Sequence, residues 1–114
     1  MKKVRCIYYE TLSGRQPVKE FVDNLCVGTQ AKFFNVLELL EDYGKNLMRP
    51  HAAPVRDGIY ELRFVGKEGH VRILYFFYDG ITAIFVHAIV KKTQKLLKKD
   101  IELAIRRKNE YFKK

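Results

Sequence analysis

The sequence predicts one α+β domain, in which an antiparallel β-meander is combined with an N-terminal strand, a helical hairpin and a C-terminal helix. Apolar residues alternate with a period of two between residues 59 and 90, which is typical of consecutive strands. Apolar residues recur at helical spacing on both sides of that region. The 114 residues, 47% of them apolar, are enough for one core and too few for two. We therefore treat residues 1–114 as a single domain.

The N-terminal part predicts one strand and two helices. Residues 4–9 are rich in β-branched and aromatic types, which favour a strand. Pro17 suits the first turn of a short helix over residues 17–26. Thr29 is expected to cap a second helix, which ends at Gly44. We expect the two helices to form an antiparallel hairpin.

The central part predicts three strands joined by short turns. Residues 59–65, 70–78 and 81–90 form these strands, with turns at Gly66–Gly69 and at Asp79–Gly80. The Asp-Gly pair between two apolar runs is a strong hairpin signal. The three strands therefore form an antiparallel meander.

Two segments complete the order. Residues 45–58 contain two prolines and are predicted to be a loop. Residues 97–112 have an apolar stripe and form the last helix, with Arg106 and Arg107 expected to face outward. We expect the helical hairpin to cover one face of the sheet and leave the other face open for function.

The charge of the chain is concentrated at its end. Residues 1–90 hold 12 basic and 10 acidic side chains, a net of +2, whereas residues 91–114 hold ten basic and three acidic ones, a net of +7. A polyanion such as RNA, DNA or the ribosome would explain this segment. A solvated helix or a basic face for an acidic protein is the alternative. The residues expected to contact RNA or the ribosome are Lys95, Lys98, Lys99, Arg106 and Arg107.

Several function classes are excluded by the sequence. No apolar run is long enough to span a bilayer, and we expect no membrane partner. The N-terminus lacks the apolar region of an export signal, so we expect a cytoplasmic protein with reduced cysteines. The two cysteines and three histidines form no metal-ligand pattern, and no phosphate-binding glycine loop or dinucleotide motif is present. We therefore expect no cofactor and no metal.

Polar side chains within the apolar strands are the candidates for chemistry. They are Glu61, Arg63, Arg72, His87, Lys91 and Lys92. Charges in such strands are costly unless they are paired or face water. Each of these residues also has a purely structural explanation. Glu61 can form a cross-strand ion pair with Arg63 or Arg72, His87 can be a hydrogen-bonded strand histidine, and Lys91 and Lys92 can be a pair of surface lysines.

A cluster of this composition suits cleavage of RNA without a metal. The 2′-hydroxyl of RNA is the nucleophile, so the protein needs a base for its proton, cations for the phosphate and an acid for the leaving 5′-oxygen. Arginine suits the second role because its planar fork binds two phosphate oxygens.

Four segments together resemble the RelE/HigB toxin superfamily, and most closely its phage-derived, HigB-like branch. They are Gly58-Ile-Tyr-Glu-Leu-Arg-Phe, His70-Val-Arg-Ile-Leu-Tyr-Phe, His87-Ala-Ile-Val-Lys-Lys-Thr-Gln-Lys and Ile101-Glu-Leu-Ala-Ile-Arg-Arg. The resemblance covers nearly the whole chain in the same element order. It implies a RelE-like fold and a type II toxin that is a ribosome-dependent endoribonuclease, or mRNA interferase. It also implies a cognate helix-turn-helix antitoxin and a toxin–antitoxin heterotetramer.

The resemblance also implies roles for particular residues. Arg72 matches the family arginine at the scissile phosphate, Arg63 matches a basic residue of the preceding strand, and Lys92 falls where RelE-type members have another cation. Glu61 replaces a lysine of RelE proper and is usual in the HigB-like branch. Lys98 stands where RelE proper has a C-terminal tyrosine, so Glu61, His87 and Lys91 are left as alternative acids and bases. A catalytically degenerate RNA- or protein-binding module of the same fold is the second hypothesis.

Overall fold

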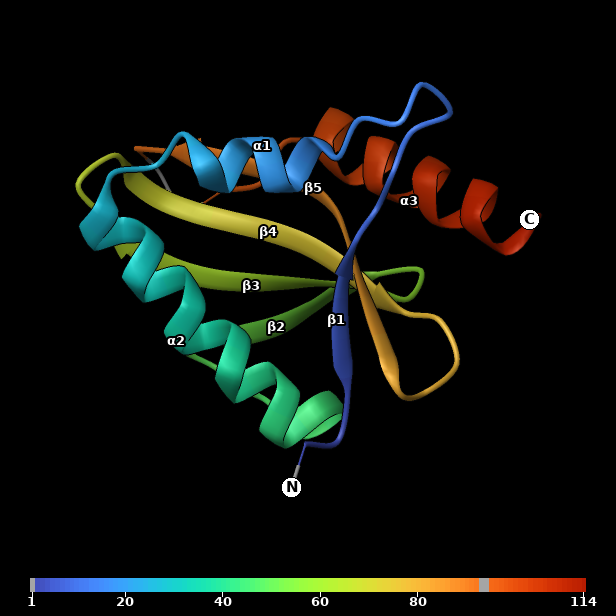
Figure 1. The fold of residues 1–114 in the computed structure, drawn as a ribbon, viewed down its shortest axis with the longest axis horizontal. Helices are drawn as coiled ribbons and strands as arrows, with labels where there is room; N and C mark the ends of the chain where they lie inside the picture. Colours follow the sequence, from blue (N-terminus) through green and yellow to red (C-terminus); the bar gives the residue numbers. More distant parts are fainter. Residues whose placement is uncertain (1, 93–94) are drawn as a thin grey trace.

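The fold is an α+β arrangement of one five-stranded sheet and three α-helices, as the sequence predicts (Figure 1). It is seen in a computed structural model that describes residues 2–92 and 95–114. The elements are β1 (Arg5–Tyr8), α1 (Pro17–Asp23), α2 (Val27–Tyr43), a 3₁₀ turn (Gly44–Asn46), β2 (Ala52–Arg56), β3 (Ile59–Gly66), β4 (Gly69–Phe77), β5 (Thr82–Lys91) and α3 (Lys98–Phe112).

The sheet has the order β1-β5-β4-β3-β2. Strands β2 to β5 form an antiparallel meander, and β1 pairs in parallel with β5 at the far edge. The prediction of a loop over residues 45–58 is wrong, because β2 lies within it and pairs with β3. Pro54 obscured this strand in the sequence, since proline is tolerated in a strand only at a sheet edge or a bulge.

The helices α1 and α2 cover one face of the sheet, here called the α1/α2 face (Figure 1). The larger cluster of buried hydrophobic residues lies on this face, together with the buried Thr29 of α2. The largest fully buried side chains of this cluster are Phe33, Leu40, Leu62, Ile73, Tyr75 and Phe85.

The other face of the sheet, here called the α3 face, is covered in part by α3. Leu74, Phe76, Ile84 and Val86 of the sheet pack with Ala104 of α3 in a second, smaller core. The expectation of an open face is therefore wrong for the part of the sheet under α3. The apolar stripe of α3 packs in this core, and the polar strand residues lie on the same face of the sheet.

The start of α2 differs from the prediction for a physical reason. The helix begins at Val27, with Cys26 as its N-cap residue, whereas Thr29 lies in the first turn and is 1% exposed. The cap comes from Glu68 in the β3–β4 turn, which accepts hydrogen bonds from the Cys26 backbone N–H and the Thr29 hydroxyl, both at 2.6 Å. Since this cap comes from about 40 residues away, local sequence rules could not locate it.

None of the helices in the described part of the chain is both long enough and apolar enough to cross a lipid bilayer.

Candidate functional site

A β-bulge in β5 brings polar residues of that strand onto the α3 face. The register between β4 and β5 shifts between Leu74 and Tyr75, so that Leu74 pairs with His87 and Tyr75 pairs with Phe85. Because Leu74 faces α3, His87 also faces that side, and strand alternation then places Lys91 there too. Lys92 follows the end of β5 and is exposed.

Two arginines and one glutamate form a cluster on the same face. Arg63 of β3 lies directly opposite Arg72 of β4. The carboxylate of Glu61 lies between them, with its Oε1 atom 3.2 Å from Arg72 Nε and 4.0 Å from Arg63 Nε. The Arg72 side chain is only 4% exposed, so burial, opposed by the charge of Glu61, lowers the pKa of its guanidinium. One carboxylate thus lies within 4.0 Å of two guanidinium groups.

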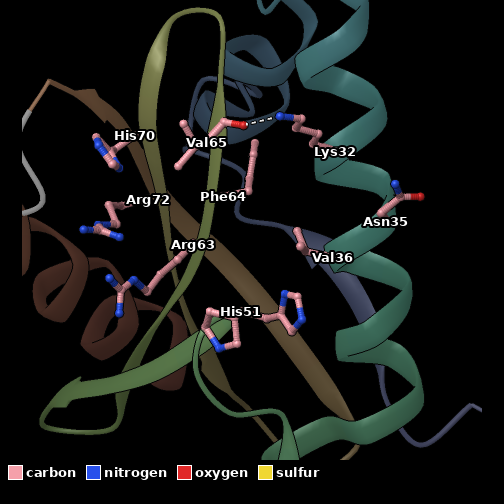
Figure 2. A pocket seen from close by; sticks show the side chains of 10 residues that line it. Lys32, Asn35, Val36, His51, Arg63, Phe64, Val65, His70 and Arg72 are labelled. Carbon is pink, nitrogen blue, oxygen red and sulfur yellow. Dashed lines mark hydrogen bonds between the residues drawn. The ribbon is translucent and has the colours of Figure 1, made fainter.

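This cluster opens into a cavity of about 490 Å³ at the edge of β3, beyond the last residue that pairs with β2. Its lining residues are Lys32, Asn35, Val36, Pro50, His51, Arg63, Phe64, Val65, His70 and Arg72. Figure 2 shows Arg63, Arg72 and His70 on one side of β3, with Lys32, Asn35 and Val36 of α2 on the other side. Among the residues that the structure describes, the lining has three cationic side chains, two histidines and no carboxylate, a composition that suits an anion.

His87 lies outside the lining of this cavity. Its Nε2 atom lies 2.9 Å from Asp100 Oδ1 in the first turn of α3. Asp100 is 7% exposed, and its second oxygen, Oδ2, has no hydrogen-bond partner among the described residues. The histidine therefore links β5 to the start of α3.

The basic residues of the last helix divide into two groups. Lys98, Lys99 and Arg106 are exposed on α3, and Lys95 is exposed just before it. The expectation that Arg107 faces outward is wrong. Its Nη1 donates a 2.6 Å hydrogen bond to the Val86 carbonyl, its guanidinium lies over the Tyr9 ring, and burial lowers its pKa.

The bulge explains the position of Arg107. A bulge leaves a backbone group outside the regular ladder, and the guanidinium satisfies the carbonyl at that point. Arg107 therefore stabilises the irregular part of β5.

His51, His70 and Lys32 line the cavity, and the sequence patterns do not predict them as site residues. His51 falls in the segment that was predicted to be a loop, and its carbonyl accepts a 2.8 Å hydrogen bond from the Arg63 N–H. Lys32 donates from Nζ to the Val65 carbonyl at 2.7 Å, a contact across 33 residues. Only His70 had a signal in the sequence, because it lies two residues before Arg72 on the same strand.

The described residues include no group of three or more His, Cys, Asp or Glu side chains that could hold a metal ion. Thr93 and Gln94, which belong to one of the segments quoted for the toxin resemblance, lie outside the described residues.

A family model described as phage derived protein Gp49-like (DUF891) matches residues 20–109. No curated protein matches the chain. The matched residues include all of α2, the four strands of the meander and most of α3, and so they include every residue of the arginine cluster and of the cavity lining. The chain therefore belongs to the Gp49-like family of phage-derived proteins, a family related to RelE/HigB-type toxins.

Proposed function

We propose that the protein is the toxin of a type II toxin–antitoxin system, of the HigB-like kind, and that it cleaves mRNA on the ribosome without a metal ion. The observation that carries the proposal is the pair of facing arginines, Arg63 and Arg72, at a cavity whose described lining residues include no carboxylate. Glu61 lies within 4.0 Å of both guanidinium groups. The phosphate of an RNA strand would bind to the same two groups from the cavity.

The reaction follows from the chemistry of RNA itself. Attack of the 2′-oxygen on the adjacent phosphorus gives a five-coordinate phosphate with increased negative charge, and two positioned guanidinium groups stabilise that charge. Lys91, on the same face, and the exposed Lys92 extend the positive region along the end of β5. Positioned acids and bases each contribute about 10² to 10⁴ in rate, so that a site without a metal suffices.

The exposed cations of the last helix support ribosome binding. Lys95, Lys98, Lys99 and Arg106 face solvent along one segment, where they can contact ribosomal RNA. The proposal includes a cytoplasmic location and a helix-turn-helix antitoxin that holds the toxin in a heterotetramer. Co-purification of a tagged chain with the product of the adjacent open reading frame would test this partner.

The decisive experiment is to map cellular mRNA by primer extension after induction of the wild-type chain, Arg63→Ala, Arg72→Ala and Arg56→Ala. Wild type should arrest growth and cut mRNA within translated frames, whereas Arg63→Ala and Arg72→Ala should lose at least about 10²-fold of the cleavage. Arg56 of β2 is the matched control, because it pairs with Asp57 outside the cavity. Arg56→Ala should therefore behave as wild type.

Two results would contradict the proposal. Cuts in untranslated RNA would indicate a nuclease that acts without the ribosome. Undiminished cleavage by folded Arg63→Ala and Arg72→Ala would remove the arginine pair from the reaction.

A non-catalytic binding module is the second candidate, and one observation favours it. Arg72 is 3% exposed and close to Glu61, which is also the environment of a structural ion pair. This module would bind RNA or a protein partner without growth arrest and without new mRNA ends in the same induction experiment.

A further inference from the structure

We infer that the part of the cavity next to α2 is a subsite for one nucleobase of single-stranded RNA, bound by Asn35 and His51. This inference rests on the RNA substrate of the proposed function, because it takes the arginine cluster as the place where a phosphate of that RNA binds. It adds to the same cavity a site that discriminates between bases and takes no part in breaking a bond.

The cavity reaches both sides of β3 because the edge of this strand is open there. Strand β2 pairs with β3 only as far as Leu62, and beyond that point the Arg63 N–H donates to the His51 carbonyl at 2.8 Å. Strand alternation places Arg63 and Val65 on the α3 face and Phe64 on the α1/α2 face. A strand of RNA can therefore cross this edge with a phosphate on one face and a base on the other.

The two parts of the cavity differ in their chemistry (Figure 2). The part on the α3 face contains the two guanidinium groups of the arginine cluster. The part next to α2 has an apolar floor of Val36 and Phe64, which are 6% and 9% exposed, and polar groups from Asn35 and His51. An apolar pocket with a few polar groups suits a heteroaromatic ring, as the guanidinium groups suit a phosphate. The two parts together match the two ends of a nucleotide.

The side chains of Asn35 and His51 are available to a ligand. Neither the Asn35 amide nor the His51 imidazole has a hydrogen-bond partner among the described residues. The amide has a donor and an acceptor side by side, an arrangement that matches the adjacent donor and acceptor on the edge of a base. Imidazole is one of the rings on which the unstacked bases of single-stranded RNA stack.

The backbone fixes the position from which the His51 ring projects. The His51 N–H donates to the Met48 carbonyl at 3.0 Å, and the His51 carbonyl accepts the bond from Arg63. Because these bonds use backbone atoms only, substitution of the imidazole leaves both of them in place. The ring is therefore positioned beside β3 before any ligand binds.

Lys32 connects the two parts of the cavity. Its Nζ donates to the Val65 carbonyl at 2.7 Å, which holds a positive charge at the open edge of β3. An RNA strand that crosses this edge passes that charge, which favours its phosphates. The cavity volume of about 490 Å³ lies within the range of about 300–1,000 Å³ that is usual for small-ligand sites, so the cavity suits a nucleotide in size.

The test measures binding of the full-length protein to fluorescent pentanucleotides whose 2′-hydroxyls are methylated, so that they cannot be cleaved. Four of them contain only A, C, U or inosine, and a fifth has the same phosphates without bases. Wild type should bind at least one of the four about fivefold or more tightly than the abasic strand, and should distinguish among the four by a similar factor. Asn35→Ala and His51→Ala should each bring these ratios close to one and leave binding of the abasic strand unchanged.

The matched controls are Asn109→Ala and His70→Ala. Asn109 is exposed on α3 as Asn35 is on α2, and it lies outside the lining of this cavity. His70 lines the cavity on the side of β3 that holds the arginines. Both variants should keep the base preference of wild type. Thermal unfolding of every variant establishes that it is folded.

The possible results separate the inference from the proposed function. Equal binding of the abasic strand and the four others by wild type overturns the base subsite, and so does an unchanged preference in folded Asn35→Ala and His51→Ala. Binding of free nucleoside 5′-monophosphates as tight as that of the pentanucleotides overturns the assignment to an RNA strand. If the base preference is found and primer extension shows no cut mRNA, the base subsite stands and the proposed cleavage fails.

Discussion

The two faces of the sheet are formed by the same strands and differ in the residues that they bury. The α1/α2 face buries the larger hydrophobic cluster, around Phe33 and Leu62, together with the hydroxyl of Thr29. The α3 face has a smaller apolar core, and it also contains the buried Arg72 and Asp100. Both polar residues face charged or polar partners on the same side.

This difference indicates a division of tasks between the faces. Burial of apolar area is the main favourable term in folding, and the α1/α2 face supplies most of it. Buried charges contribute little net stability, so their presence on the α3 face needs another reason. For Arg72 the proposed phosphate chemistry would supply such a reason, whereas Asp100 is bound to His87, and the two faces should therefore respond differently to substitution.

The largest expected effect is the loss of a large side chain from the α1/α2 face. Phe33 is fully buried and contacts Phe64 and Phe85 at ring-centroid distances of 6.2 and 6.0 Å. Phe33→Ala should lower the free energy of unfolding by about 3–5 kcal/mol, because the enclosed site cannot collapse around the cavity. Urea unfolding followed by circular dichroism measures this loss.

The matched control on the α3 face is Phe76→Ala. Phe76 is equally buried, but one of its ring contacts is Phe112, which is 49% exposed at the end of α3. The end of a surface helix can move inward more easily, so this loss should be smaller. A loss for Phe76→Ala equal to or larger than that for Phe33→Ala would contradict the unequal division of stability.

A smaller effect is expected when the charge of Glu61 is removed. Glu61→Gln leaves two guanidinium groups facing each other without their shared carboxylate. We expect the free energy of unfolding to fall by about 2 kcal/mol, because a partly buried ion pair is then incomplete. The same urea experiment measures this change.

A double variant separates stability from function at this cluster. Glu61→Leu combined with Arg72→Met replaces the ion pair by apolar groups, and such replacements are often neutral or stabilising. The double variant should therefore unfold close to wild type while failing to cleave mRNA. Loss of folding in the double variant would show that the charges of the α3 face are needed for the fold.

The elements of the fold were predictable where local pattern and tertiary packing agree. The alternation in β3 and the Asp79–Gly80 turn predicted their strands correctly, as the register of the meander shows. The short edge strand β2 was not predicted, because Pro54 and the nearby turn residues are typical of a loop. The first residue of α2 was not predicted, because the group that caps the helix comes from the β3–β4 turn.

The candidate site was predictable only in part. Glu61, Arg63 and Arg72 stood out because charges are rare in apolar strands, and the structure brings these three together. His51 gave no signal, because its position beside Arg63 depends on a strand pairing that the sequence did not reveal. The outward position predicted for Arg107 failed because the bulge that binds it is a tertiary feature.

The smallest expected effect concerns Glu68, which connects the β3–β4 turn to α2 on the α1/α2 face. Its hydrogen bonds from the Thr29 hydroxyl and the Cys26 N–H lower the pKa of the carboxyl from 4.5 to about 2. A lowered folded-state pKa stabilises the fold above the unfolded value and loses that stabilisation as pH falls. Glu68→Gln should therefore be less stable than wild type above about pH 4.5, and the difference should vanish as pH falls to about 2.

Unfolding by urea at a series of pH values measures this difference. Thr29→Val is the matched second variant, because it removes the hydroxyl donor at 2.6 Å while keeping the shape of the side chain. In the Thr29→Val background, Glu68→Gln should have a smaller effect, because the hydroxyl bond contributes most to the lowered pKa. A difference between wild type and Glu68→Gln that stays constant down to about pH 2 would mean that the carboxylate does not cap α2. Since this cap joins the turn before His70 to the helix that contributes Lys32, its loss would also be expected to loosen one wall of the cavity without removing any of its charges.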